Sequence, residues 1–335
     1  MKDIVPPARI PVHWSTTRNT IGYMKPAVIV NAHAAAGRAR LRWPRLVKRL
    51  TRSIGPVEVR FTRGLGDASV LARELASDGF DPVIAAGGDG TINEVINGLL
   101  STPCDARLGV LPLASAGDFA RTLGLSSLNV ALETLAAGSS RNVDAIRAQF
   151  RSPDGVTTRQ YVNIASIGLG GEVALAVQHG FRFLPGSLRY LAACIPKLAA
   201  NCVYQTQLFL DGSDAGTFDA TIVSLAKGRY QGGGILIAPA AVLDDGLIHI
   251  TLVNHVSLTE VIRNLPILYS GEIYAYPKVR HWQAKRVRVE VQGAAPLELD
   301  GEPVGTAPIE AEVLPRALRL ICPPPKTPSD TMSIL

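Results

Sequence analysis

The sequence lacks several features that would point to common classes of protein. No run of about 18 uncharged apolar residues occurs, so no membrane-spanning helix is predicted. The four cysteines show no CxxC spacing and the six histidines form no ligand-spaced cluster, so neither a disulfide framework nor a zinc site is expected. Residues 1–24 have no apolar core, which excludes a secretory signal and predicts a disordered leader. Together these absences predict a cytoplasmic protein.

The composition predicts a folded, basic protein. Apolar residues make up 47% and charged residues 19% of the chain, and 335 residues are enough for two domains, each with its own core. A net charge of +6 suits an anionic partner such as a membrane surface or a nucleotide. No nucleic-acid-binding motif accompanies this charge, so a nucleic acid is not predicted as a partner.

The most informative stretch is a strand followed at once by a helix. Residues 82–86 form a short apolar run bounded by turn formers, which predicts a buried strand. Apolar residues then recur at i, i+3, i+4 and i+7, which predicts a helix packed on one side; they are Ile92, Val95, Ile96 and Leu99. Strands and helices alternate up to residue 144, and this predicts an α/β domain with a doubly wound, mostly parallel sheet.

Three glycines and an aspartate join this strand to this helix. Gly87, Gly88 and Gly90 allow positive φ and a close approach of the backbone to a ligand. A helix N-terminus presents N–H groups and partial positive charge, so the junction suits a phosphate. Asp89 would repel a bare phosphate, but a Mg²⁺ ion between the two resolves this conflict. An ordinary glycine-rich turn with a surface aspartate is the alternative for this stretch alone.

Gly87-Gly88-Asp89-Gly90-Thr91, followed by Asn93-Glu94-Val95 and Asn97-Gly98-Leu99, resembles the signature of the diacylglycerol kinase catalytic-domain family. That family includes bacterial lipid kinases and the sphingosine and ceramide kinases. NAD kinases share the first five residues, whereas the longer stretch is more specific, and similarity continues along most of residues 27–320. The resemblance implies an ATP- and Mg²⁺-dependent kinase that phosphorylates a lipid hydroxyl, diacylglycerol first, at the membrane surface.

The resemblance also implies a set of nucleotide-binding residues. Thr62 ends a predicted strand on the side where ligands collect in open α/β sheets. Ser115 keeps a hydroxyl in a loop where alanines and Gly117 replace the family's glycines and asparagine, and this departure puts the tightness of ATP binding in doubt. The expected nucleotide-binding residues are Asn31, Thr62, Gly87, Gly88, Asp89, Gly90, Thr91, Ile92, Asn93 and Ser115.

From residue 145 the pattern changes to short alternating segments separated by turns such as Asp211-Gly212. This pattern predicts a β-rich sandwich domain over residues 145–314, with the active site in the cleft between the two domains. By resemblance, residues 315–323 return to the first domain, which spans residues 25–144. Residues 324–335 are predicted to be a disordered tail.

Two acidic segments of the second domain resemble family elements. In the segment that contains Asp245, the resemblance implies a structural Mg²⁺ held by its carboxylate and by the carbonyls of Val242 and Leu247. An Asp-Gly hairpin turn is the alternative there. Around Gly301, the resemblance implies Glu302 as the general base and Asp300 as its support.

The catalytic Mg²⁺ is assigned to the first domain. Asp144 matches the family's acidic residue near the phosphates, and we expect it to hold this ion together with Asp89.

Residues 38–52 are predicted to form a helix with basic residues and no acidic residue; the basic ones are Arg38, Arg40, Arg42, Arg45, Lys48, Arg49 and Arg52. A solvated helix face is one interpretation, and contact with anionic lipid headgroups at the membrane, as a peripheral protein, is the other.

Two other functions stay open at this point. One is a lipid-binding homologue of the same fold that has lost kinase activity, and the other is an NAD kinase. The acceptor lipid and the oligomeric state, a dimer included, are not determined by the sequence.

Overall fold

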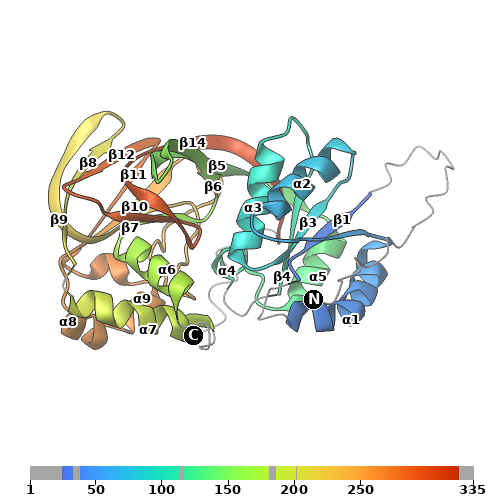
Figure 1. The fold of residues 1–335 in the computed structure, drawn as a ribbon, viewed down its shortest axis with the longest axis horizontal. Helices are drawn as coiled ribbons and strands as arrows, with labels where there is room; N and C mark the ends of the chain where they lie inside the picture. The colour runs from blue at the N-terminus through green and yellow to red at the C-terminus, as the bar shows by residue number, and fades with distance from the viewer. Residues whose placement is uncertain (1–24, 33–37, 114–116, 181–185, 201, 324–335) are drawn as a thin grey trace.

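The computed structural model of the protein describes residues 25–32, 38–113, 117–180, 186–200 and 202–323. The predicted leader, the predicted tail and Ser115 lie outside these residues. The described residues form two domains that lie side by side, an α/β domain and a β-rich domain (Figure 1). Among the described residues, no helix has the length and apolarity needed to cross a membrane.

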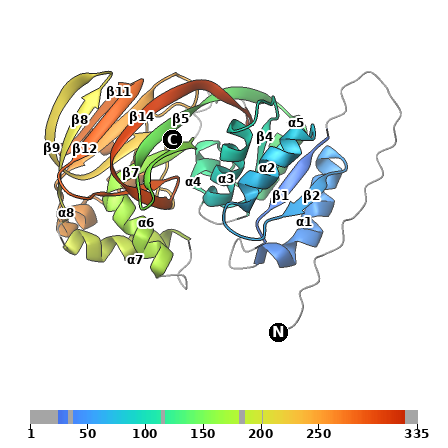
Figure 2. The ribbon, with the colours of Figure 1, turned by 45° about the horizontal axis from the view of Figure 1, so that its top comes forward.

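The first domain contains a parallel sheet with the strand order β2-β1-β3-β4. Its strands are β1 (Ala27–Val30), β2 (Glu58–Phe61), β3 (Val83–Gly87) and β4 (Leu108–Pro112). Its helices are α1 (Arg38–Ile54), α2 (Asp67–Ser77), α3 (Asp89–Leu100), α4 (Asp118–Thr122) and α5 (Leu128–Ala137). Helix α1 packs with α5 and α2 packs with α3, and the two pairs cover opposite faces of the sheet (Figures 1 and 2).

The apolar pattern of this domain explains its layers. Every residue of β1 and β3 is buried, as expected for strands covered by helices on both faces. The predicted helical stripe is confirmed, because Ile92, Val95, Ile96 and Leu99 of α3 are all at most 4% exposed.

The second domain is β-rich, as predicted. Its strands are β6 (Gly155–Tyr161), β7 (Ile164–Gly168), β8 (Tyr204–Leu210), β9 (Ser213–Ala226), β10 (Ile248–Asn254), β11 (Val279–Ala284), β12 (Arg286–Val291) and β13 (Pro296–Leu299). Its helices are α6 (Leu169–His179), α7 (Gly186–Ala199), α8 (Leu258–Arg263), α9 (Ile267–Ser270) and the 3₁₀ helix η1 (Ile273–Ala275). The predicted turn at Asp211-Gly212 joins β8 to β9, and both of its residues have positive φ.

The strand pairing of this domain is continuous rather than divided between two separate sheets. It runs from β9 through β7, β13, β14 (Glu302–Ile321), β12 and β8 and returns to β9. Strands β10 and β11 extend this ring from β9, while β5 (Ser140–Ser152) and β6 extend it from β14. The inward-facing apolar side chains form a core separate from that of the first domain.

Two long strands connect the domains. Strands β5 (Ser140–Ser152) and β14 (Glu302–Ile321) pair antiparallel along most of their length and arch together from one domain to the other (Figure 2). One end of β14 pairs in parallel with β4 through Leu320, which lies in the first core, whereas Ile309 lies in the second core. The two domains therefore share a hydrogen-bonded connection instead of a flexible linker.

Candidate active site

An apolar pocket opens in the second domain and ends at the boundary with the first. Its walls come mainly from α6, α7, α8 and α9 and from the segment that follows β9. Apolar side chains dominate this lining, among them Val173, Leu198, Ile235, Val261, Leu265 and Leu268. Such a pocket suits a ligand with an apolar chain.

The inner end of the pocket carries four carboxylates, which we call the acidic cluster: Asp89, Asp118, Glu298 and Asp300. Tyr190 of α7 lines the same end, and burial together with the charges of nearby carboxylates raises its pKa to about 12. The first domain contributes two of the carboxylates and the β13–β14 hairpin contributes the other two. The cluster therefore forms only when the two domains are joined.

Asp89 begins α3 and is fixed by the adjacent helix. Its carboxylate oxygens accept hydrogen bonds from the backbone N–H groups of Asp118 (3.0 Å) and Phe119 (3.1 Å), at the start of α4. Burial raises the pKa of Asp89, and these two hydrogen bonds oppose that rise. An aspartate held in this way faces the pocket in a defined position, as a ligand of a cation must.

The glycines beside Asp89 act through space rather than through unusual backbone angles. None of the three glycines, Gly87, Gly88 and Gly90, has a positive φ, and the φ of Gly88 is −100°. A side chain at Gly87 would collide with Thr91, so this glycine lets β3 and α3 pack closely. The three glycines therefore do not use positive φ, and the expected close approach of the backbone to a ligand stays a prediction.

Most of the predicted nucleotide-binding residues are brought together by the parallel sheet. Asn31 follows β1, Thr62 follows β2 and the Gly87–Thr91 turn follows β3, so all lie at one edge. The Asn31 Nδ2 group donates a hydrogen bond of 3.0 Å to Thr91 Oγ1. Ile92 is buried in the core, and its N–H donates to the Gly88 carbonyl. Binding of nucleotide by this edge stays a prediction.

Asn93 has a different connection from the rest of that set. Its Nδ2 group donates a hydrogen bond of 2.7 Å to Asp300 Oδ2 across the domain boundary. The neighbouring Asn97 donates to the carbonyl of Gln160 on β6 and accepts from its N–H. These two amides of α3 thus join the first domain to the second.

Asp300 is the most highly coordinated member of the acidic cluster. It occupies the β13–β14 turn with a φ of 49°, and its carboxylate accepts hydrogen bonds from Asn93 and from the N–H groups of Val162, Asn163 and Ile164. Burial raises its pKa to about 6 even though all four hydrogen bonds lower it. This carboxylate therefore positions the hairpin against α3 and β7, and its support of Glu302 in catalysis stays a prediction.

The two glutamates of this hairpin point to different environments. Leu299 and Glu302 are directly paired, so their side chains share one face, whereas Glu298 lies on the other. Glu298 is 2% exposed, lines the pocket and accepts a hydrogen bond from the Gly301 N–H; burial raises its pKa to about 8. Glu302 is 45% exposed and lies 3.2 Å from an Arg159 nitrogen. Glu302 lies outside the pocket lining, next to Gly301, which belongs to it.

Two members of the acidic cluster received no role from the sequence. Asp118 accepts a hydrogen bond of 2.8 Å from the Gly233 N–H, and burial raises its pKa to about 6. The sequence signal for Asp118 is its place three residues after Ser115, directly beyond the loop that is expected to bind nucleotide. The signal for Glu298 was its spacing of two from Asp300, since residues i and i+2 of a strand share a face.

The predicted structural Mg²⁺ site contains a lysine. Lys227 Nζ lies 2.7 Å from Asp245 Oδ1 and 2.9 Å from the Leu247 carbonyl, and it also contacts Asp144 at 2.7 Å. Val242 is 43% exposed, and it is the neighbouring Leu243 carbonyl that accepts the Asp144 N–H. This differs from the prediction for Asp245 and Leu247, because an ammonium group stands where the structural ion was expected.

Asp144 has different partners from Asp89 and lies outside the pocket that Asp89 lines. Its carboxylate accepts hydrogen bonds from Gly246 N–H (2.8 Å) and Arg316 N–H (2.9 Å) as well as from Lys227, and it is 1% exposed. Asp144 does not line the apolar pocket. Within the described part of the chain, no three His, Cys, Asp or Glu side chains are grouped so as to hold a metal ion.

Comparison with known proteins agrees with this architecture. The profile of the diacylglycerol kinase catalytic domain matches residues 25–148, and that of the YegS C-terminal NAD kinase beta sandwich-like domain matches residues 163–322. The chain is 36% identical to the "Probable lipid kinase YegS-like" of Chromohalobacter salexigens over 79% of this chain and 83% of that protein. The chain belongs to the diacylglycerol kinase family.

Further members support the same assignment. The diacylglycerol kinase of Bacillus subtilis is 33% identical over 78% of this chain and 84% of that protein. The crystal structure of a diacylglycerol kinase from Bacillus anthracis superimposes with a TM-score of 0.68 at 23% identity, covering 91% of this chain and 99% of that one; this likeness concerns the fold. Membership of this kinase family implies ATP as the co-substrate.

Proposed function

We propose that this diacylglycerol kinase family member transfers the γ-phosphate of ATP to the hydroxyl of a lipid, with diacylglycerol as the first acceptor to test. The observation that carries the proposal is the apolar pocket that ends at the acidic cluster, beside the Gly87–Thr91 turn. The apolar chain would lie among α6, α7, α8 and α9, and the hydroxyl would reach the carboxylates. The acceptor of an NAD kinase is soluble, and an apolar pocket of this kind would not be needed to bind it.

The residues present fit a magnesium ion carried with ATP. Asp89 supplies hard oxygen ligands, and Asp118 Oδ1 is a buried oxygen without a hydrogen-bond donor among the described residues. Burial and mutual repulsion oppose the charge on these carboxylates, and a divalent cation would relieve both effects. When bound, the ion would neutralise charge on the transferred phosphoryl group. Asp89, with Asp118 beside it, would hold the ion against the phosphates.

We assign the proton acceptor to Glu302, as the resemblance implies. Glu302 is half exposed, faces the Arg159 guanidinium and directly follows Gly301, which lines the pocket, so its carboxylate is within reach of a hydroxyl that enters there. Its pair with Arg159 is half exposed, and such pairs contribute only about 0–1 kcal/mol, so releasing Glu302 towards the pocket costs little. Glu298, whose pKa is raised to about 8, holds its proton near neutral pH and would instead fix the Gly301 turn.

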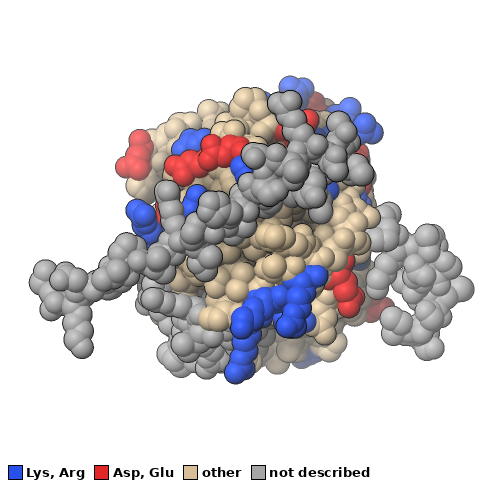
Figure 3. Space-filling model, turned by 90° about the vertical axis from the view of Figure 1, so that its right-hand side faces the viewer, with Lys and Arg blue, Asp and Glu red and all other residues tan. Residues whose placement is uncertain are grey.

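Contact with a membrane is part of this proposal. Lys and Arg side chains gather in a band over α1 on one face of the first domain (Figure 3). Arg45, Lys48, Arg49 and Arg52 of α1 are exposed, whereas Leu46 and Leu50 are buried. A basic band of this type attracts anionic headgroups at a cytoplasmic membrane surface.

The experiment that tests the proposal is a transfer assay with purified protein, radiolabelled ATP, Mg²⁺ and a panel of acceptors. The panel contains diacylglycerol, monoacylglycerol, sphingosine and NAD. We expect label in a lipid and none in NAD. Label in NAD alone would replace the proposal with an NAD kinase, and lipid binding without any transfer would show the inactive homologue.

A further inference from the structure

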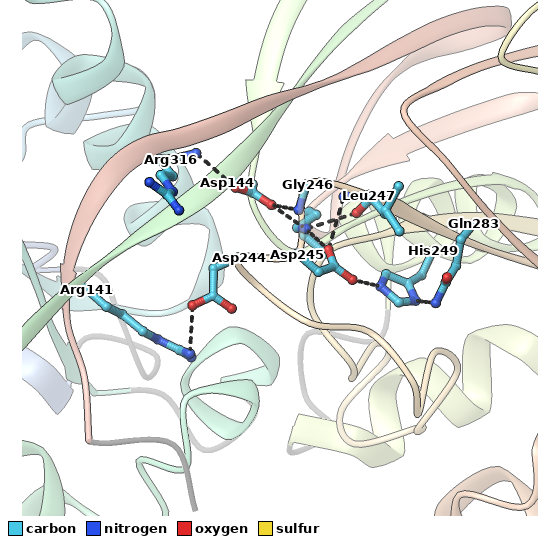
Figure 4. Close-up of polar contacts among 10 residues, drawn as sticks. Arg141, Asp144, Asp244, Asp245, Gly246, Leu247, His249, Gln283 and Arg316 are labelled. Carbon is cyan, nitrogen blue, oxygen red and sulfur yellow. Dashed lines mark hydrogen bonds and ion pairs between the residues drawn. The ribbon is translucent and has the colours of Figure 1, made fainter.

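Lys227 lies at the centre of a polar cluster between the two domains, away from the pocket. We call it the junction cluster, and it consists of Asp144, Lys227, Asp245, the Leu247 carbonyl and His249 (Figure 4). Lys227 follows β9 and is 0% exposed. Its ammonium group donates to three oxygens, at 2.7, 2.7 and 2.9 Å, and this equals its number of N–H donors.

The partners of Lys227 are themselves held from several directions. Asp144 on β5 also accepts the N–H groups of Gly246 and Arg316, and Arg316 belongs to β14. Asp245 Oδ2 lies 2.7 Å from His249 Nε2 on β10. Burial alone would raise the pKa of Asp245, but the hydrogen bonds from Lys227 and His249 hold it below its usual value. The cluster thus ties β5 and β14, which join the domains, to β9 and β10 of the second domain.

The oxygens around Lys227 are also those that a hard cation would use. Two carboxylates and a backbone carbonyl form an oxygen-only set of the type that binds Mg²⁺ or Ca²⁺. The ammonium group already occupies the space they enclose, and a second cation there would be repelled by it. Lys227 and a metal ion are therefore alternatives at this position.

We propose that Lys227 is a built-in cation that replaces a structural metal ion at the domain junction. The fold of this chain then depends on no divalent ion at the junction, and removing the lysine leaves a site that a divalent ion can fill. The inference concerns folding and metal binding, and it does not depend on the lipid or on phosphoryl transfer.

The position of Lys227 also links the junction cluster to the pocket. The N–H groups of Lys227 and Gly228 both donate to the Asn163 carbonyl, next to the segment that coordinates Asp300. Further along the same loop, Gly233 donates to Asp118 of the acidic cluster. Replacing Lys227 should therefore disturb the loop that closes the inner end of the pocket.

The test begins with the intact full-length chain without nucleotide. We expect its thermal midpoint to be the same in EDTA and in millimolar MgCl₂, and its metal content after dialysis to be well below one ion per chain. A midpoint that falls in EDTA and returns with Mg²⁺ would overturn the proposal, because a metal would then hold the junction.

Substitution of Lys227 tests whether its ammonium group stabilises the junction cluster. Lys227→Met keeps the length of the side chain but leaves the buried Asp144 and the partly exposed Asp245 without their cation, and we expect the midpoint to fall by roughly 5–10 °C. Lys278→Met is the matched control, because Lys278 forms an equally short pair with Glu260 but is 40% exposed; its midpoint should change by only about 1 °C. Equal effects of the two changes would overturn the proposal.

Lys227→Ala removes the ammonium and opens space among its oxygens. We expect Mg²⁺ or Ca²⁺ to raise the midpoint of this variant by several degrees while leaving that of the wild type unchanged. If Lys227→Ala does not fold, a double variant replaces it. Lys227→Met/Asp245→Asn has one uncompensated carboxylate fewer than Lys227→Met, so its thermal midpoint should be higher. A double variant no more stable than the single one, or a Lys227→Ala protein that ignores both ions, would contradict the proposal.

Discussion

The acidic cluster and the junction cluster both bury carboxylates between the same two domains, but they differ in how charge is compensated. In the junction cluster a fully buried ammonium contacts two carboxylates, and the pKa of Asp245 is lowered. The acidic cluster contacts Arg121, which is 41% exposed, and burial raises the pKa of Glu298 to about 8. The carboxylates with an internal cation thus serve the fold, whereas Asp89 and Asp118, which have no fully buried cation, stay available to a ligand.

Asp89→Asn and Asp144→Asn provide the strongest test of the comparison. We expect Asp89→Asn to reduce phosphoryl transfer by roughly 10³-fold or more, because an amide cannot neutralise a divalent cation. Its thermal midpoint should change little, since the asparagine oxygen can still accept one of the two N–H groups that begin α4 and the buried charge is removed. Asp144→Asn should instead lower the midpoint. Transfer near the wild-type rate at saturating Mg²⁺ would remove Asp89 from the mechanism.

Glu302→Gln and Glu298→Gln separate the base from its neighbour in the same hairpin. We expect Glu302→Gln to lower kcat by roughly 10²–10⁴-fold, the usual contribution of a general base, with ATP affinity by calorimetry retained. Glu298→Gln resembles the protonated carboxyl already present near neutral pH, so its effect on kcat should be small. The opposite pattern would assign the base to Glu298.

Val261→Trp tests whether the acidic cluster receives a lipid through the apolar pocket. Val261 lines the pocket, whereas its neighbour Ile262 is 63% exposed, so Ile262→Trp is a matched control. Loss of room for about two methylene groups should raise KM for a long-chain diacylglycerol by roughly 10-fold. The KM for ATP should not change. Equal effects of both substitutions would show that the lipid binds elsewhere.

The pH dependence of stability sharpens the comparison further. Because the pKa of Glu298 is raised from 4.5 to about 8 on folding, the folded protein keeps a proton that the unfolded chain releases between these values. Stability should therefore decrease as pH rises through this range, with a contribution of up to about 1.4 kcal/mol per pH unit. Denaturant unfolding at pH 6 and pH 8 should show a smaller decrease for Glu298→Gln. An identical decrease would mean that Glu298 titrates normally.

The smallest effect is expected outside both clusters. Reversing the charges of Arg45, Lys48 and Arg52 should weaken sedimentation with anionic vesicles severalfold, and added salt should weaken wild-type binding. Transfer to a short-chain acceptor dispersed in detergent should be unaffected. If the wild type binds neutral and anionic vesicles equally, the basic face of α1 is a solvated helix face that does not bind anionic headgroups.

The parts of this structure that local pattern determines could be predicted from the sequence. A short apolar run predicted β3, and helical spacing of apolar residues predicted the buried face of α3, because each pattern follows the geometry of its own element. The Gly87–Thr91 motif predicted one side of the candidate site, because its residues are consecutive in the sequence.

Features that depend on distant contacts could not be predicted. Lys227 follows an apolar strand as a single basic residue, and no spacing in the sequence shows that Asp144 and Asp245 surround it. Glu298 and Glu302 are both acidic residues near one glycine, and only the hairpin register places them on opposite faces. The continuity of β14 depends on its pairing with β5, which is irregular between Leu314 and Leu318.

The shared strand β14 has a consequence for how the protein is made. The edge of β4 is hydrogen-bonded in the finished protein to Leu320, and the segment between them contains the entire second domain. During synthesis the first domain therefore emerges with that edge unpaired, and it stays so until almost all of the described chain has left the ribosome. Exposed strand edges promote association between chains, so premature termination within β14 should yield an aggregating fragment rather than an independent nucleotide-binding domain.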